Sequence, residues 1–173
     1  MTITMTKRPL NDREVELLIE EIKKFPNLVA GNKRRWQKLE QIYVATLNKE
    51  FVGVYGITTF HNWYKIGPFV VLEKYQGKGY GKTIIENIVK DYSNVNLLTI
   101  SRTPAVWKIM THFSFQEVSL GKLPYIAKMC LIHNILQLLS IDTIKELLRK
   151  RSAQEEPYHY FVRRTKPIFH ELS

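Results

Sequence analysis

The apolar residues between Val15 and Phe25 recur at intervals of three and four positions. This spacing predicts an amphipathic helix, because residues so spaced lie on one helical face. Asn11-Asp12 precedes the stretch and Pro26 follows it, and such residues typically begin and end helices. The basic segment at residues 31–41, which contains Trp36, predicts a short second helix.

The hydrophobic period then changes from helical to extended. Three β-rich segments follow at residues 42–47, 51–60 and 63–72, separated by turns of a few residues. Strands that are joined by such short turns pair antiparallel, so these segments predict an antiparallel meander. Gly67-Pro68 interrupts the third segment and predicts a bulge or a splay at that point.

The rest of the chain alternates between helical and extended patterns. The expected elements are helices at 79–92 and 104–113, strands at 94–100, 115–120 and 158–164, and helical segments at 125–139 and 140–150. The whole order predicts an α/β (α+β) fold, in which flanking helices cover a mixed, largely antiparallel central sheet.

Composition indicates a single globular domain. The chain has 173 residues, of which 45% are hydrophobic and 24% are charged. Cys130 is the only cysteine, which excludes an intrachain disulfide. The sequence has no apolar run that could span a bilayer and no apolar block near Met1, so we expect a cytoplasmic protein without a membrane span.

The net charge of +10 adds a constraint on partners. A positive field attracts phosphates, nucleic acids or anionic membranes, although it also serves solubility alone. The same field disfavours polyamines and lysine-rich peptides as ligands.

A glycine-rich segment between the third β-rich segment and the following helix carries the strongest chemical signal. It reads Gln76-Gly77-Lys78-Gly79-Tyr80-Gly81-Lys82. Its three glycines let backbone N–H groups converge without obstruction by side chains. The start of the helix adds unpaired N–H donors and the positive end of the helix dipole, and together these suit a pyrophosphate.

Two other phosphate-binding motifs do not fit this segment. A P-loop requires a glycine where Gln76 stands, although Gly81-Lys82-Thr83 supplies its second half. A dinucleotide-binding turn has the spacing G-x-G-x-x-G after the first strand of a βαβ unit, whereas here G-x-G-x-G follows a meander.

Residues 71–81 resemble the signature of the GNAT N-acetyltransferases, whose core pattern is Gln/Arg-x-x-Gly-x-Gly/Ala. Gln76, Gly79 and Gly81 fill its three defined positions, and the order of elements along the chain is similar as well. The resemblance implies a GNAT-like acyl-CoA fold over residues 1–173. It also implies direct transfer of an acetyl group from acetyl-CoA to a primary amine.

The resemblance assigns acetyl-CoA to two neighbouring segments. Backbone amides of the turn would bind the pyrophosphate, and the preceding strand would hold the pantetheine arm and the acetyl carbonyl. The implied cofactor-binding residues are Phe69, Val70, Val71, Gln76, Gly77, Lys78, Gly79, Tyr80, Gly81, Lys82 and Thr103. No metal is expected.

The proton donor of the family is missing from its usual place. The family has a tyrosine four residues before a Gly-Phe pair, which corresponds to Ser114-Phe115 here, and that position holds Met110. Methionine cannot donate a proton, so another group acts or the thiolate leaves unaided. The candidates are Tyr158 and Tyr160 on the last strand as acids, and His61 and Glu73 as bases, each weighed against an ordinary surface role.

The sequence of residues 121–157 predicts a helical insert before the last strand, where folds of the family commonly have a short hairpin. Its apolar residues cover more than one helix face, which favours a lid over the acceptor or a homodimer contact rather than a membrane-surface helix. The alternative function is a non-catalytic module that binds acyl-CoA, or nucleic acid through basic clusters around Trp36 and Tyr160. No motif identifies the acceptor.

Overall fold

The computed structural model describes residues 3–25, 33–37, 39, 41–138 and 157–165, without side chains at 34, 35 and 134–138. The strands are β1 (Thr4–Lys7), β2 (Gln41–Leu47), β3 (Glu50–Phe60), β4 (Trp63–Val71), β5 (Asn96–Ser101), β6 (Gln116–Val118) and β7 (His159–Arg163). The helices are α1 (Asp12–Lys23), α2 (Lys33–Gln37), α3 (Tyr80–Asp91), α4 (Pro104–His112) and α5 (Tyr125–Leu138), with short 3-10 turns η1 (Glu73–Tyr75) and η2 (Leu120–Lys122).

The described strands form one sheet in the order β1-β2-β3-β4-β5-β7-β6. Only the β4–β5 pair is parallel, so the expected mixed and largely antiparallel sheet is confirmed. The predictions omitted β1, which pairs with β2 at the edge of the sheet. This four-residue strand is mostly exposed, so it lacks the apolar alternation by which a strand is recognised.

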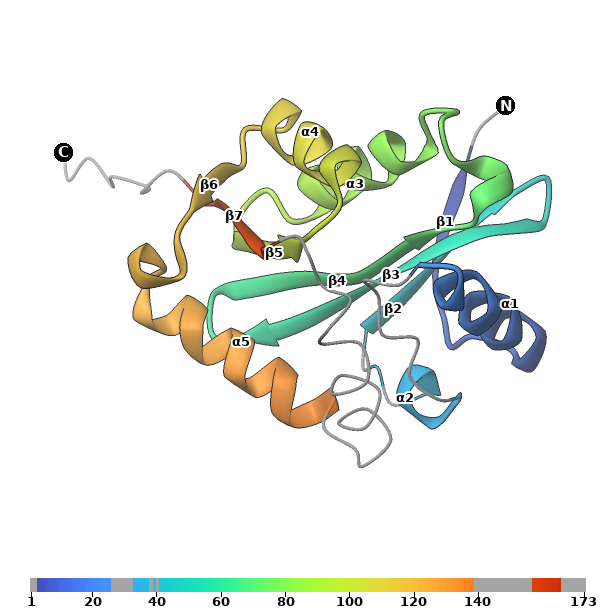
Figure 1. The fold of residues 1–173 in the computed structure, drawn as a ribbon, viewed down its shortest axis with the longest axis horizontal. Helices are drawn as coiled ribbons and strands as arrows, with labels where there is room; N and C mark the ends of the chain where they lie inside the picture. The colour runs from blue at the N-terminus through green and yellow to red at the C-terminus, as the bar shows by residue number, and fades with distance from the viewer. Residues whose placement is uncertain (1–2, 26–32, 38, 40, 139–156, 166–173) are drawn as a thin grey trace, which may run out of the picture.

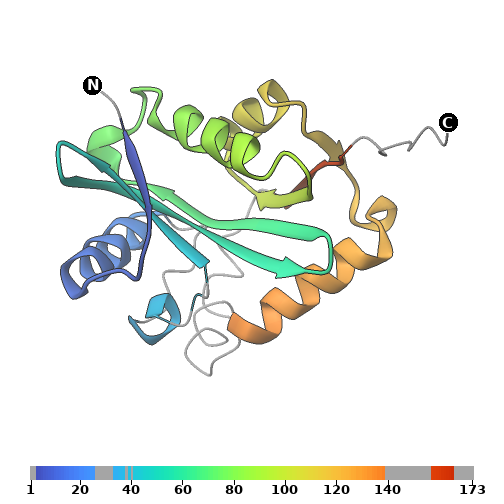
Figure 2. The same cartoon turned by 180° about the vertical axis from the view of Figure 1, so that it is seen from behind.

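The helices lie on both sides of the sheet. Figures 1 and 2 show α3 and α4 along one side, and α1, α2 and α5 along the other. The main core contains the apolar faces of α1 and α3, including Val15, Leu18, Ile84 and Ile88. The predicted amphipathic stripes therefore face the sheet, as their spacing indicated.

The sheet opens between β4 and β5. Their parallel pairing ends at Ile66 and Thr99, whereas β4 stays paired with β3 as far as Val71. The cis peptide Gly67–Pro68 and a register shift in the β3–β4 pair mark the point where the two strands part. Within the described residues no strand pairs with the β5-facing edge of residues 67–71. The splay that the sequence predicted at Gly67-Pro68 is thereby confirmed.

A second apolar cluster joins α5 to the sheet. Its members are Trp63, Leu98, Leu123, Ala127, Cys130, Leu131 and Val162. Cys130 is buried, and this burial raises the pKa of its thiol, which disfavours the reactive thiolate. The predicted helix at 140–150 lies outside the described residues. None of the helices in the described ranges combines the length and the apolar character that crossing a bilayer requires.

Candidate functional site

The glycine-rich turn begins just after β4 and leads into α3. Gly77 and Gly79 have φ angles of +72° and +83°, a backbone region that favours glycine. Gly79 is the N-cap of α3, and no side chain caps this end of the helix. Because Thr83 N–H donates to the Gly79 carbonyl at 3.1 Å, the amides of residues 80–82 are left for a ligand or water. The helix start thus presents a set of uncapped N–H donors.

The space in front of the turn is open. A Cβ atom added to Gly77 or to Gly79 would meet no other atom within 4 Å. Gly81 differs, because a Cβ there would lie 3.5 Å from Ile109 Cδ1 and 3.6 Å from Phe69 Cζ. Gly81 therefore places the start of α3 against α4 and β4, while the other two glycines shape the exposed rim.

Side chains fix the turn to the sheet. Gln76 Nε2 donates to the Val71 carbonyl at 2.8 Å, and the buried Tyr75 donates its hydroxyl to Glu50 at 2.6 Å. Lys78 Nζ donates to the Lys74 carbonyl at 2.8 Å. In this structure the Gln76 side chain therefore orients the turn, and its role in binding the cofactor stays a prediction.

The open edge of β4 presents backbone amides. Leu72 N–H donates to the Val52 carbonyl at 2.9 Å, and hydrogen-bonded residues alternate along an antiparallel pair. Val70 therefore directs its peptide groups toward β3, and its carbonyl oxygen lies against Gly53. Phe69 and Val71 direct theirs toward the splay, where Gln76 already occupies the Val71 carbonyl. Of the three predicted residues, Phe69 and Val71 offer N–H groups to a ligand.

The opposite wall of the splay is the end of β5 and the start of α4. Thr103 is the N-cap residue of α4, and its N–H donates to Ser101 Oγ at 3.0 Å. Trp107 Nε1 donates to the Ser101 carbonyl at 3.2 Å. Met110 is completely buried between α4 and the sheet. The thioether at the family's tyrosine position is therefore part of the core.

His61 lies far from this site. It occupies the turn between β3 and β4 with a φ of +53°, and its ring contacts Phe60 edge-on. The nine residues of β4 separate His61 from the glycine-rich turn, and a strand of this length spans about 30 Å. The structure does not bring His61 together with the other predicted catalytic residues.

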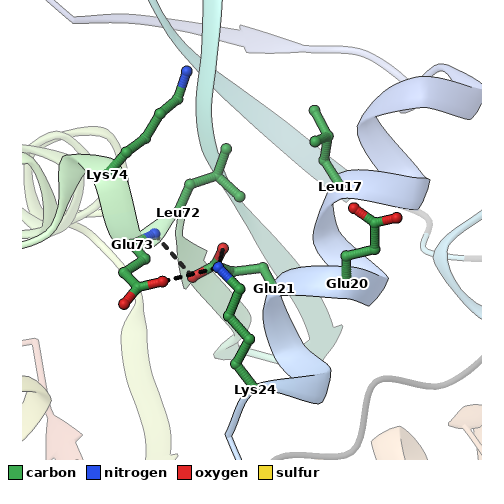
Figure 3. A pocket seen from close by; sticks show the side chains of 7 residues that line it. All are labelled: Leu17, Glu20, Glu21, Lys24, Leu72, Glu73 and Lys74. Carbon is green, nitrogen blue, oxygen red and sulfur yellow. Dashed lines mark hydrogen bonds and ion pairs between the residues drawn. The ribbon is translucent and has the colours of Figure 1, made fainter.

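Glu73 follows β4 and pairs with α1. Its carboxylate lies 2.8 Å from Lys24 Nζ, and this hydrogen bond holds the pKa of Glu73 below its usual value. Figure 3 shows the Glu21 carboxylate directed at Glu73 and at Lys24. It accepts a hydrogen bond from the Glu73 N–H at 2.9 Å and pairs with Lys24 Nζ. These contacts line a cavity of about 350 Å³ beside α1. Both carboxylates thus join α1 to the turn.

Tyr158 and Tyr160 lie near the splay wall. Tyr160 on β7 pairs with Ile100 of β5 and packs against the α5 cluster. Tyr158 is 47% exposed, and the Arg102 guanidinium carbon lies 3.7 Å from its ring centroid. Of the four predicted catalytic residues, these two lie beside β5, whereas Glu73 follows β4 and pairs with Lys24 at the end of α1.

Arg102 and His159 were absent from the sequence predictions. Arg102 follows β5 directly, and an arginine immediately after a buried apolar strand is a signal that was available. His159 Nδ1 lies 2.6 Å from Glu117 Oε1, and its ring packs 3.9 Å from that of Trp107. This pair depends on the contact between β6 and β7, which local sequence does not indicate.

Comparison with known proteins places these features in a family. The model of the acetyltransferase (GNAT) family matches residues 12–105, slightly more than half of the chain. That range includes the meander, the glycine-rich turn and both walls of the splay. A search of curated proteins gave no match.

Solved structures share the fold. The ribosomal-protein-S18-alanine N-acetyltransferase of Escherichia coli has a TM-score of 0.67 at 11% identity, over 99% of each chain. A GNAT-family acetyltransferase of Staphylococcus aureus has a TM-score of 0.63 at 16% identity, over 95% of this chain and 100% of that one. The N-acetylglutamate synthase of Neisseria gonorrhoeae, complexed with coenzyme A and N-acetyl-glutamate, has a TM-score of 0.64 at 15% identity. It covers 96% of this chain, which spans only 36% of the synthase.

Proposed function

The chain belongs to the acetyltransferase (GNAT) family, and from this premise we propose that it transfers an acetyl group from acetyl-CoA to a primary amine. The observation that carries the proposal is the continuity of two sets of free amides. The uncapped start of α3 continues directly into the open edge of β4, where Phe69 and Val71 face the splay.

The donor fits this arrangement in two parts. The pyrophosphate of acetyl-CoA would accept hydrogen bonds from the amides of residues 80–82, beside the exposed side chains of Lys78 and Lys82. The pantetheine arm would then lie along the unpaired edge of β4. Coenzyme A in the related N-acetylglutamate synthase supports this assignment at the level of the fold.

The chemical step is a direct displacement. The neutral amine attacks the thioester carbonyl, a C–N bond forms, the C–S bond breaks, and the amine proton is lost as the thiolate gains one. An N–H of Phe69 or Val71 would stabilise the negative charge that develops on the carbonyl oxygen. The protein would act mainly by alignment and by this polarisation.

Tyr158 is the candidate acid that we favour for the leaving thiolate. It lies beside Arg102, which follows the splay wall, whereas Tyr160 lies beside Ile100, closer to the paired part of the strands. We expect Tyr158→Phe to lower kcat by about a hundredfold with little change in KM, as loss of a general acid does. An unchanged kcat would show that Tyr158 is not the acid.

A non-catalytic acyl-CoA-binding module is the second candidate, because Met110 replaces the family's usual proton donor. The nucleic-acid alternative has less support. Trp36 is only 3% exposed, so the aromatic ring in the basic segment is not available to stack on a base.

Titration calorimetry with acetyl-CoA, followed by thiol release with a panel of amines, tests the proposal. Binding together with amine-dependent release of coenzyme A is the expected result. Binding without release for any amine would favour the non-catalytic module, and the absence of binding would contradict both. A stable acetyl group on Cys130 would contradict direct transfer.

A further inference from the structure

Arg102 is a half-buried cation without a counter-ion among the described residues. Its Nε and Nη1 atoms are buried, and neither makes a hydrogen bond within the part of the chain that the structure describes. The ring of Tyr158 covers one face of the guanidinium, with the carbon 3.7 Å from the ring centroid. This stacking holds the guanidinium in place but satisfies none of its N–H groups.

Leaving these groups unpaired has an energetic cost. A buried donor without a partner loses its hydration and gains nothing in return. The cost is larger for a charged group, and a planar guanidinium is the side chain best suited to bind a carboxylate through two parallel hydrogen bonds. The position therefore has the chemistry of a preformed anion site.

Its place in the fold connects it to the proposed reaction. The last β4–β5 pair is Ile66 with Thr99, so the third residue beyond it on each strand is Phe69 and Arg102. Arg102 thus lies at the same depth along the splay as the first free amide of β4. It follows Ile100 by two residues, and Ile100 packs in the α5 cluster, so strand alternation places Arg102 on the α5 side of the sheet.

A second cation lies on this side of the opening. Lys65 lies opposite Leu98 of the α5 cluster in the β4–β5 pair. Its Nζ lies 3.2 Å from the position that a Cβ atom on Gly67 would take. Together with the net charge of +10, this surrounding disfavours a polycationic acceptor.

Resting on the proposed function, we propose that Arg102 binds a carboxylate of the acceptor, so that the acceptor class is amino acids and other amines that carry a carboxylate. The carboxylate would accept hydrogen bonds from this guanidinium, whose Nε and Nη1 have no partner among the described residues. The amine of the same molecule would then be directed into the splay, toward the thioester at Phe69 and Val71.

The test compares each of the common amino acids with its α-carboxamide in the acetyl-transfer assay. The amine of a carboxamide is less basic and therefore more often neutral, so it would react faster if the carboxylate were not recognised. We expect at least one amino acid whose kcat/KM exceeds that of its carboxamide by about tenfold or more, the gain typical of a charge-assisted hydrogen bond.

Variants of Arg102 make the test specific. Arg102→Gln is expected to lower kcat/KM for the amino acid by about 10- to 100-fold more than kcat/KM for its carboxamide. Arg102→Lys keeps the charge but lacks the planar guanidinium, so its kcat/KM for the amino acid should lie between those of Arg102→Gln and the unmodified protein. Arg164→Gln removes an exposed charge beyond the other end of β7 and is the matched control, with no expected effect. Thermal denaturation confirms that each variant is folded.

Three outcomes would overturn the inference. Carboxamides or polyamines that react as well as amino acids would show that no carboxylate is recognised. If Arg102→Gln loses as much affinity for acetyl-CoA, measured by calorimetry, as it loses in kcat/KM for the amino acid, Arg102 would belong to the donor site. If no amine is acetylated, the proposed enzyme fails separately. In that case, binding of amino acids to the protein loaded with coenzyme A tests the carboxylate site. Loss of this binding in Arg102→Gln supports the site, and no binding by the unmodified protein overturns it.

Discussion

Tyr55 lies completely buried on β3, and its hydroxyl has no hydrogen-bond partner among the described residues. Its ring stacks on Tyr43 of the neighbouring strand, with centroids 4.6 Å apart. Tyr43 and Tyr92 share a hydrogen bond between their hydroxyl groups. The three tyrosines thus pack together beneath α3, but only two of them are satisfied as polar groups.

Removing the unsatisfied hydroxyl tests this difference. We expect Tyr55→Phe to raise the free energy of unfolding by about 1 kcal/mol, because a buried hydroxyl without a partner opposes folding. Tyr43→Phe keeps the ring but leaves the Tyr92 hydroxyl alone, so it should lower the same quantity by about 1 kcal/mol. Urea unfolding measures both, and a Tyr55→Phe protein less stable than the original would contradict the assignment.

The same residues predict an alkaline limit to stability. Burial raises the pKa of Tyr55, and burial together with the Tyr43 hydrogen bond raises that of Tyr92. Above the ordinary tyrosine pKa of about 10, the unfolded chain therefore loses protons that the folded chain retains. Unfolding free energy should fall as pH rises beyond this value, and Tyr55→Phe should reduce the slope. Urea unfolding between neutral and alkaline pH measures it.

At the scale of elements, the turn before α3 depends on backbone conformation more than on side chains. Gly79 has a φ of +83°, and its open surroundings mean that a methyl group there would meet strain but no clash. The amides that follow it are those assigned to the pyrophosphate. The conformation of one residue therefore determines the direction of several donors.

Substitution of Gly79 by alanine separates strain from packing. We expect the free energy of unfolding to fall by about 1–2 kcal/mol, because alanine is disfavoured at positive φ. The affinity for acetyl-CoA should fall as well, by about tenfold if one amide turns away. Gly121→Ala is the control, since Gly121 has open space and no positive φ. Unchanged acetyl-CoA affinity in Gly79→Ala, measured by calorimetry, would remove the turn from the donor site.

Elements that depend on local sequence were predictable, and those that depend on distant contacts were not. The β2–β4 meander, the glycine-rich turn and the splay at Gly67-Pro68 follow from patterns within a few residues. The position of β7 between β5 and β6 does not, because it pairs residues that lie far apart in the chain. Arg102 gains its environment from Tyr158 through this placement, so its unusual burial could not be deduced from the sequence.

At the scale of the whole molecule, charge favours the donor as a ligand. The net charge is +10, and Lys74, Lys78 and Lys82 are exposed around the turn. Acetyl-CoA is a polyanion, so long-range attraction adds to the contacts at the site. Such attraction between exposed charges is screened by salt over about 10 Å at 0.1 M ionic strength.

The affinity for acetyl-CoA should therefore weaken with salt. We expect the dissociation constant to rise roughly tenfold between about 0.05 and 0.5 M NaCl, because the lysines around the turn are exposed to screening. Acetyl-pantetheine, which lacks the phosphates, is the control and should bind independently of salt. Fluorescence titration measures both ligands, and a salt-independent affinity for acetyl-CoA would contradict the assigned phosphate contacts.

The connection between β6 and β7 leaves and re-enters the sheet at adjacent strands. Because its two ends are held together, a change in its length would cost little free energy and would leave the remaining strands in register. The donor-binding half of the molecule lies before this connection in the chain. Exchange of residues 119–157 between members of the family should therefore preserve the use of acetyl-CoA, because the glycine-rich turn, the open edge of β4 and Tyr158 all lie outside the exchanged segment.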